Sequence, residues 1–234
     1  MSSISNNLQA VRAHLTEAAS KAGRDPEEIS LLAVSKTFDA NSVVEAAHAG
    51  QYSFGENYLQ EALEKMLQLR ILLPENALEW HFIGPIQSNK TRPIAENFSW
   101  VHSVDREKVA ARLSEQRPAN LPPLNICLQV NISGEASKSG VLPKEAVALA
   151  KKIAILKNVR LRGLMAVPEA SDDPLEQRRA FGQLRELKQQ IEAEGIALDT
   201  LSMGMSGDMD AAIAEGSTMV RIGSAIFGKR TYAE

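Results

Sequence analysis

The strongest constraint on the fold is a regular alternation of strand-like and helix-like segments. Eight short apolar segments of strand character are separated by segments in which apolar residues recur at every third or fourth position. The strand-like segments cover residues 30–36, 52–54, 79–83, 100–104, 124–132, 159–166, 199–203 and 219–222. Parallel strands need a crossover connection, which is usually a helix. The alternation therefore predicts a parallel sheet with a helix after each strand.

The expected helices lie between these strands, and one more helix, over residues 5–22, precedes the first strand. The most regular helix is expected over residues 174–193, with one buried stripe made of Leu175, Phe181, Leu184, Leu187 and Ile191. The remaining helices are expected over residues 42–49, 57–69, 90–96, 106–116, 144–156 and 207–215.

Eight strands that alternate with helices fit a single α/β domain, a (β/α)8 TIM-type barrel with an additional N-terminal helix. A doubly wound open sheet is the alternative. The barrel is favoured because the chain of 234 residues stops soon after the eighth strand and no Pro/Gly/Ser-rich linker divides it. Residues 1–234 are therefore expected to form one domain.

Charge and targeting signals narrow the classes of function. The net charge is −3 without any block of lysine or arginine, so we expect no nucleic-acid partner. The N-terminus has no signal-peptide pattern and no segment approaches the roughly 18 apolar residues of a membrane span, so a cytoplasmic protein is expected. The four histidines and the one cysteine, Cys127, have no metal-ligand spacing, and Cys127 lies in an apolar segment typical of core packing.

Lys36 ends the first predicted strand, where the apolar segment stops. Strand alternation places Leu32, Val34 and Lys36 on one face, so the amine lies at the edge of an apolar surface. Partial desolvation disfavours the ammonium form, and the free amine forms a Schiff base with an aldehyde. A solvated lysine that closes a strand is the alternative.

Two turns with small residues follow the last two predicted strands. Ser206 lies in the first of them, and Gly223 and Ser224 lie in the second. Backbone N–H groups and serine hydroxyls in such turns bind phosphate, and barrels often bind phosphate after strands seven and eight. Ordinary turn chemistry explains either turn taken alone.

Arg221 is expected to point into the barrel, because its neighbours Val220 and Ile222 face the helices. A buried guanidinium needs hydrogen-bond acceptors. A salt bridge to Glu79 or Asp199 is one interpretation, although both residues lie near the opposite ends of their strands. An aromatic nitrogen of a ligand is the other. The amine, the phosphate turns and the arginine together are typical of a pyridoxal 5'-phosphate site.

Further candidate site residues have two interpretations each. Asn57 either hydrogen-bonds the cofactor or caps the following helix. His81 and Met165, near the ends of the third and sixth strands, either pack against the cofactor ring or belong to the core. Lys138 is either solvated or contacts cofactor at the rim.

Seven sequence motifs resemble the pyridoxal phosphate homeostasis protein family. They lie at residues 32–36, 54–57, 80–84, 87–90, 163–165, 201–206 and 220–223, and the resemblance runs from the N-terminal helix to Gly228. The family resembles the barrel domain of alanine racemase without its second domain. At Ser224 the family commonly has threonine, which keeps the hydroxyl group.

The resemblance implies a cytoplasmic, usually monomeric protein that holds pyridoxal phosphate on Lys36 and affects vitamin B6 balance without an established reaction. Transient contact with B6-dependent enzymes follows from such a role. An amino-acid racemase is the alternative, but racemisation needs a base on each face of the ring and only Lys36 is evident. A Schiff-base aldolase shares the lysine and the phosphate turns but leaves Arg221 unexplained.

Overall fold

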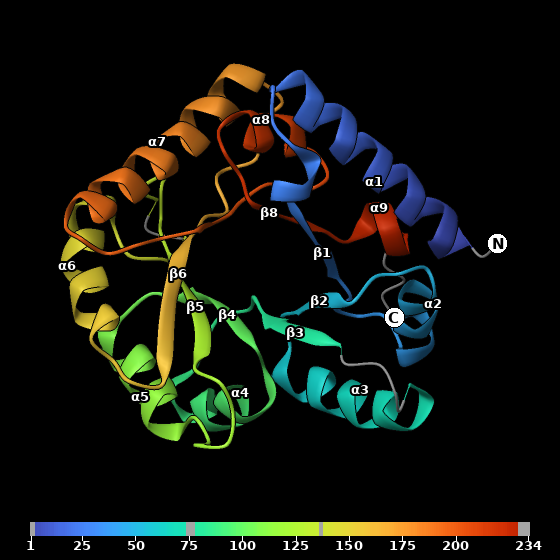
Figure 1. Cartoon of the computed structure of the whole chain (residues 1–234), viewed down its shortest axis with the longest axis horizontal. Coiled ribbons are helices and arrows are strands. Elements are labelled where there is room, and N and C mark those ends of the chain that lie inside the picture. The colour runs from blue at the N-terminus through green and yellow to red at the C-terminus, as the bar shows by residue number, and fades with distance from the viewer. Residues whose placement is uncertain (1–2, 74–77, 136–137, 229–234) are drawn as a thin grey trace.

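The computed structural model describes residues 3–73, 78–135 and 138–228, which form a closed barrel of eight parallel strands (Figure 1). Consecutive strands are neighbours, and β8 pairs with β1 to close the barrel. The strands are β1 (Ser30–Val34), β2 (Ser53–Glu56), β3 (Glu79–Phe82), β4 (Trp100–Val104), β5 (Leu124–Gln129), β6 (Val159–Met165), β7 (Thr200–Ser202) and β8 (Met219–Ile222). The predicted barrel is thus confirmed, and the open sheet is not what the chain forms.

A ring of helices surrounds the strands (Figure 1). These are α1 (Ser3–Lys21), α2 (Ala40–His48), α3 (Leu59–Leu72), α4 (Thr91–Asn97), α5 (Glu107–Gln116), α6 (Pro143–Ala154), α7 (Pro174–Ala193), α8 (Met209–Ala214) and α9 (Ser224–Phe227), with two 3-10 turns, η1 (Pro26–Glu28) and η2 (Ser88–Lys90). The expected strands and helices are found with their ends shifted by at most three residues. None of the described helices is long and apolar enough to cross a membrane.

The N-terminal helix α1 covers the place where the barrel closes. The helix that follows β8, α9, is only 4 residues long, and α1 packs against both α8 and α9. Its apolar stripe, which includes Leu8 and Val11, is buried, and Asn7 Nδ2 donates a hydrogen bond of 2.9 Å to the carbonyl oxygen of Ile226. The additional helix predicted from the sequence therefore completes the outer ring.

One residue predicted to lie on the buried stripe of α7 is exposed in the structure. Leu175 is 75% exposed, whereas Phe181, Leu184 and Ile191 are buried. A helix turns by about 100° per residue, so the stripe that contains Leu184 continues at position 177, and Leu175 lies about 200° away from it. Leu175 therefore belongs to the outer face of the first helical turn.

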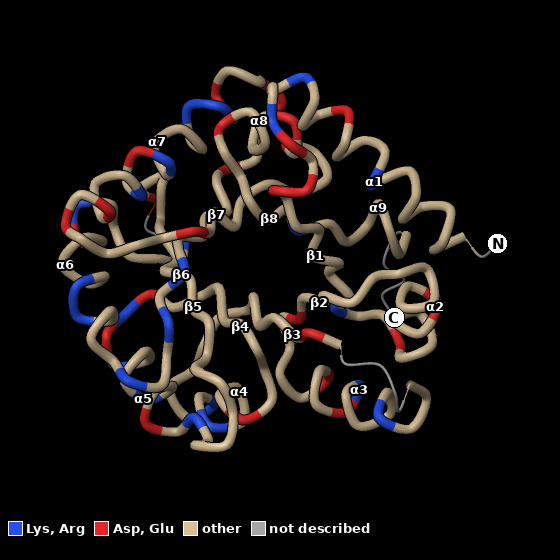
Figure 2. Tube along the Cα trace, in the orientation of Figure 1, with Lys and Arg blue, Asp and Glu red and all other residues tan. Residues whose placement is uncertain are grey.

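The buried apolar residues form two clusters, one large and one small. Aliphatic and aromatic residues fill the space between strands and helices, whereas a small separate cluster of Trp100, Cys127 and Met165 is buried apart from them. Burial raises the pKa of Cys127 to about 12, which fits the predicted role in packing. Along the Cα trace, Lys and Arg residues and Asp and Glu residues lie mostly on the outer helices and loops (Figure 2).

Gly163 on β6 gives a test of this close packing. A Cβ atom at this position would clash with the carbonyl oxygen of Thr200 on β7, far inside van der Waals contact, so one strand must move. We expect Gly163→Ala to lower the free energy of unfolding by about 1 to 3 kcal/mol, as overpacking does. Gly207→Ala, where nothing lies within 4 Å, is the control and should change it by less than about 0.5 kcal/mol. Urea unfolding followed by circular dichroism measures both, and equal midpoints would contradict the packing argument.

Candidate functional site

Lys36 lies directly after β1, in the turn that leads to α2. Its side chain is half-buried, and the next residue, Thr37, has a φ of 69°, in the left-handed region that residues other than glycine rarely adopt. The backbone N–H of Thr37 donates a hydrogen bond of 2.6 Å to Glu61 Oε1 on α3. This bond holds the strained residue, so the turn after Lys36 has a defined shape.

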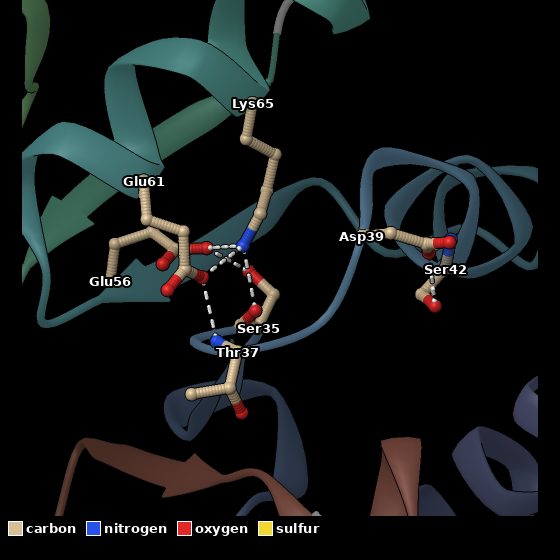
Figure 3. Close-up of polar contacts among 7 residues, drawn as sticks. All are labelled: Ser35, Thr37, Asp39, Ser42, Glu56, Glu61 and Lys65. Atoms are coloured by element: carbon tan, nitrogen blue, oxygen red, sulfur yellow. Dashed lines mark hydrogen bonds and ion pairs between the residues drawn. The ribbon is translucent and has the colours of Figure 1, made fainter. Parts of the chain in front are cut away.

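A buried ionic cluster supports the other side of the same turn (Figure 3). Lys65 Nζ lies 2.7 Å from Glu56 Oε1 and 3.1 Å from Glu61 Oε1, and it donates to the carbonyl oxygen of Ser35 at 2.8 Å. The Ser35 hydroxyl also donates to Glu56 Oε1, at 2.7 Å. Burial raises the pKa of Glu56, and the nearby Lys65 acts against this rise. The cluster therefore fixes the residues on both sides of Lys36.

Neither Lys65 nor Glu61 was among the residues predicted from the sequence to lie near the site. The signal was present, because Lys65 lies on the buried stripe of α3 formed by Ala62, Met66 and Leu69, four residues after Glu61. A lysine on an apolar stripe needs an acidic partner inside the protein. The sequence alone did not show that this partner comes from the end of β2.

Asn57 follows β2, the strand beside β1, and does not cap a helix. Helix α3 begins at Leu59, and its cap residue Tyr58 makes no side-chain capping bond, so the capping interpretation is wrong. Asn57 Oδ1 and Glu56 Oε2 are buried without a hydrogen-bond donor among the described residues. Gly84 brings the next loop close, since a Cβ atom there would lie 2.1 Å from the carbonyl oxygen of Asn57. Such buried acceptors are uncommon and need an explanation.

Arg221 on β8 points into the barrel and is 5% exposed. Among the described residues, its hydrogen-bond acceptors are the carbonyl oxygens of Ser202 and Ala166 and the Ser202 hydroxyl. The salt bridge considered from the sequence is not present, because Glu79 bonds to His81 and Asp199 bonds to Arg162. Burial lowers the pKa of Arg221 to about 10, so the group stays charged at neutral pH.

The two turns with small residues follow β7 and β8 as predicted. Ser206 is exposed in the turn before α8, and Ser224 is exposed as the first residue of α9. Gly223 lies close to β1, because a Cβ atom there would be 3.2 Å from the carbonyl oxygen of Val34. Since β7, β8 and β1 are successive strands of the closed barrel, both turns lie at the same end of the barrel as Lys36.

The remaining predicted site residues lie in the barrel or on its surface. His81 is fully buried, and its ring nitrogens lie 2.9 Å from His102 Nε2 and 3.0 Å from Glu79 Oε2. Met165 is buried in the small cluster with Trp100 and Cys127, and Lys138 is exposed. Among the described residues, no group of three His, Cys, Asp or Glu is placed to hold a metal ion.

Comparisons of this chain with a family model and with known proteins agree on one family. Residues 6–231 match the model of the alanine racemase N-terminal domain. The pyridoxal phosphate homeostasis protein of Pseudomonas aeruginosa is 61% identical over 232 residues, which cover 99% of this chain and 98% of that protein. The protein of the same name from Escherichia coli K12 is 51% identical, with 100% of both chains covered.

Solved structures show the same fold. The structure of PipY from Synechococcus elongatus with pyridoxal phosphate bound has a TM-score of 0.83 at 34% identity and covers 96% of this chain and 100% of that one. Alanine racemase from Corynebacterium glutamicum shares the fold, with a TM-score of 0.68 at 19% identity over 99% of this chain and 62% of the racemase. By sequence and by structure, this chain belongs to the pyridoxal phosphate homeostasis protein family.

Proposed function

We propose that this protein binds pyridoxal 5'-phosphate as a Schiff base on Lys36 and acts in vitamin B6 homeostasis as a carrier or regulator. The observation that carries the proposal is the meeting of three features on the successive strands β7, β8 and β1. These are a half-buried lysine, two turns with serine hydroxyls, and a buried arginine bonded to uncharged oxygens. The PipY structure with pyridoxal phosphate bound supports the assignment.

Each proposed contact follows from the chemistry of its residue. The Lys36 amine would condense with the aldehyde of the cofactor and release water. The hydroxyls of Ser206 and Ser224 and the backbone N–H groups of their turns, including that of Gly223, bind the phosphate. Arg221 donates to the ring nitrogen, and the amide of Asn57 bonds the 3'-oxygen of the ring.

The two remaining candidate residues shape the site from the interior. Met165, at the end of β6 and buried with Trp100 and Cys127, is proposed to pack its apolar side chain against the cofactor ring. His81 is proposed to support the site from the barrel interior and not through a hydrogen bond to the cofactor, because both of its ring nitrogens already have partners.

The arrangement favours a carrier over a racemase. Racemisation moves a proton to either face of the ring and needs two placed bases, of which Lys36 is one. His81 is a poor second base, because burial lowers its pKa and its nitrogens bond to His102 and Glu79. An arginine that keeps its proton also leaves the ring nitrogen unprotonated, so the ring withdraws electrons less strongly. We therefore propose a monomeric cytoplasmic protein that passes cofactor to B6-dependent enzymes through transient contacts.

The position of the cofactor is tested by reduction and peptide mapping. Wild-type protein mixed with pyridoxal phosphate should gain an absorption band near the visible range, and borohydride should abolish the band and fix the cofactor on the peptide that contains Lys36. Lys65 is the internal control, because its amine is 4% exposed and paired with two carboxylates. No band, or a label on Lys65, would contradict the assignment.

The phosphate contacts are tested by removing both hydroxyls. Ser206→Ala combined with Ser224→Ala should weaken cofactor binding by roughly 1 to 3 kcal/mol, because hydrogen bonds to a charged group are lost while backbone donors remain. Ser20→Ala, on the exposed face of α1, is the matched control. Fluorescence titration measures the affinities, and an unchanged double variant would place the phosphate elsewhere.

The carrier and racemase functions differ in proton exchange. In deuterated water, an enzyme would exchange the Cα proton of L-amino acids about a million times or more faster than free pyridoxal phosphate does. We expect no such rate enhancement from the protein with bound cofactor. Lys36→Ala is measured in parallel. Fast exchange that depends on Lys36 and yields the D-isomer would establish the racemase instead.

A further inference from the structure

A row of hydrogen-bonded side chains crosses the barrel and ends on Arg221. Ser202 Oγ on β7 lies 2.8 Å from Arg221 Nη1 and 2.7 Å from His102 Nδ1 on β4. His102 Nε2 lies 2.9 Å from His81 Nδ1 on β3, and His81 Nε2 lies 3.0 Å from Glu79 Oε2. Glu79 is the first residue of β3, and its side chain is 45% exposed. The row thus connects the arginine at the cofactor end to a carboxylate near the other end of the barrel.

The protons in this row have one arrangement when Glu79 is ionised and both histidine rings are neutral. A neutral His81 that donates to Glu79 must accept from His102, so His102 Nδ1 accepts the hydroxyl proton of Ser202, and Ser202 Oγ accepts from Arg221, which only donates. His102, with Nδ1 as acceptor, carries its proton on Nε2 and donates to His81 Nδ1. His81 likewise carries its proton on Nε2 and donates to the Glu79 carboxylate. Every donor therefore points from Arg221 towards Glu79.

The surroundings keep both histidine rings neutral. Burial lowers the pKa of His102 well below its ordinary value, and the positive charge of Arg221 adds to this effect, as a proton on His81 would. Burial also lowers the pKa of His81, more than the bond to Glu79 raises it. Arg162, which lies over the Trp100 ring beside this row, pairs with Asp199.

We infer that His102 is a positioning residue that sets the direction of this row and so holds Arg221 in place for the cofactor, through Ser202. The inference rests on the proposed function. Ser202 Oγ presents its lone pairs to Arg221 because its proton is taken up by His102 Nδ1. Without that acceptor, the hydroxyl is free to turn its proton towards the guanidinium, and Arg221 loses its only side-chain acceptor among the described residues. The guanidinium then has one fewer bond that fixes its orientation.

A pair of substitutions separates this role from simple packing. In His102→Asn, the amide oxygen takes the approximate place of Nδ1 and still accepts from Ser202. In His102→Leu, the acceptor is lost but more of the buried volume is filled. Both variants lose the bond to His81. If His102 acts only through packing, the leucine variant should bind the cofactor more tightly than the asparagine variant. If His102 has the inferred role, the asparagine variant should bind more tightly.

The first measurement uses the protein without cofactor, labelled with 15N in its histidines. Long-range proton–nitrogen spectra distinguish the two neutral tautomers from the charged ring, and the signals that vanish in His102→Asn identify residue 102. We expect His102 and His81 to be neutral with the proton on Nε2 at neutral pH. A charged His102, or a proton on its Nδ1, would overturn the inference.

The second measurement is cofactor binding by fluorescence titration, with thermal unfolding as the check on folding. Ser202→Ala and His102→Leu should bind pyridoxal phosphate about tenfold more weakly than wild type, which corresponds to about 1.4 kcal/mol. The affinity of His102→Asn should stay within about threefold of that of wild type. Equal affinities of the two His102 variants, or weaker binding by asparagine, would overturn the inference. A wild-type protein that does not bind the cofactor would instead overturn the proposed function, and the spectra keep the two results apart.

Discussion

The pairing of β8 with β1 is the constraint on which the site depends. It joins the last strand of the barrel to the first and aligns Arg221 with Leu32 and Ile222 with Ala33. Parallel strands in register bring their carboxyl ends to one rim, so the loops after β8 and β1 lie side by side. Each feature of the candidate site on these strands would be unremarkable alone. Closure of the barrel makes them one site.

Three cationic side chains are buried among the described residues, and they are stabilised in different ways. Lys65 pairs with the carboxylates of Glu56 and Glu61, and so its charge is neutralised within a few ångströms. Arg221 is surrounded by carbonyl and hydroxyl oxygens, which accept its protons without neutralising its charge. Arg117, at the end of the outer helix α5, also donates to backbone carbonyl oxygens. Bonding to dipoles therefore does not by itself mark a ligand site, and what distinguishes Arg221 is its position on β8 inside the barrel.

Local patterns in the sequence were sufficient to predict the barrel and the placement of Lys36, Arg221 and the two turns. Each of those predictions depends on strand alternation and on the rule that strand ends meet at one rim. The partners that were missed depend on contacts between distant segments. The ion pair between Lys65 and Glu56 joins α3 to the end of β2, and the bond between His102 and Ser202 spans 100 residues of sequence. No local pattern marks such partners. The errors at Leu175 and Asn57 were local, because they depended on the phase and the first residue of a helix.

The position of α1 over the closure of the barrel also determines when the site forms. Asn7 and Ile226 are joined by a hydrogen bond although 219 residues separate them, so the two sides of the closure meet only after nearly the whole chain has been synthesised. Contacts of such long sequence separation form late, because loop closure must come first. A nascent chain on the ribosome has Lys36 early but lacks the turns after β7 and β8. The candidate site is therefore assembled late in folding, once β8 has paired with β1 and α1 has packed over the closure.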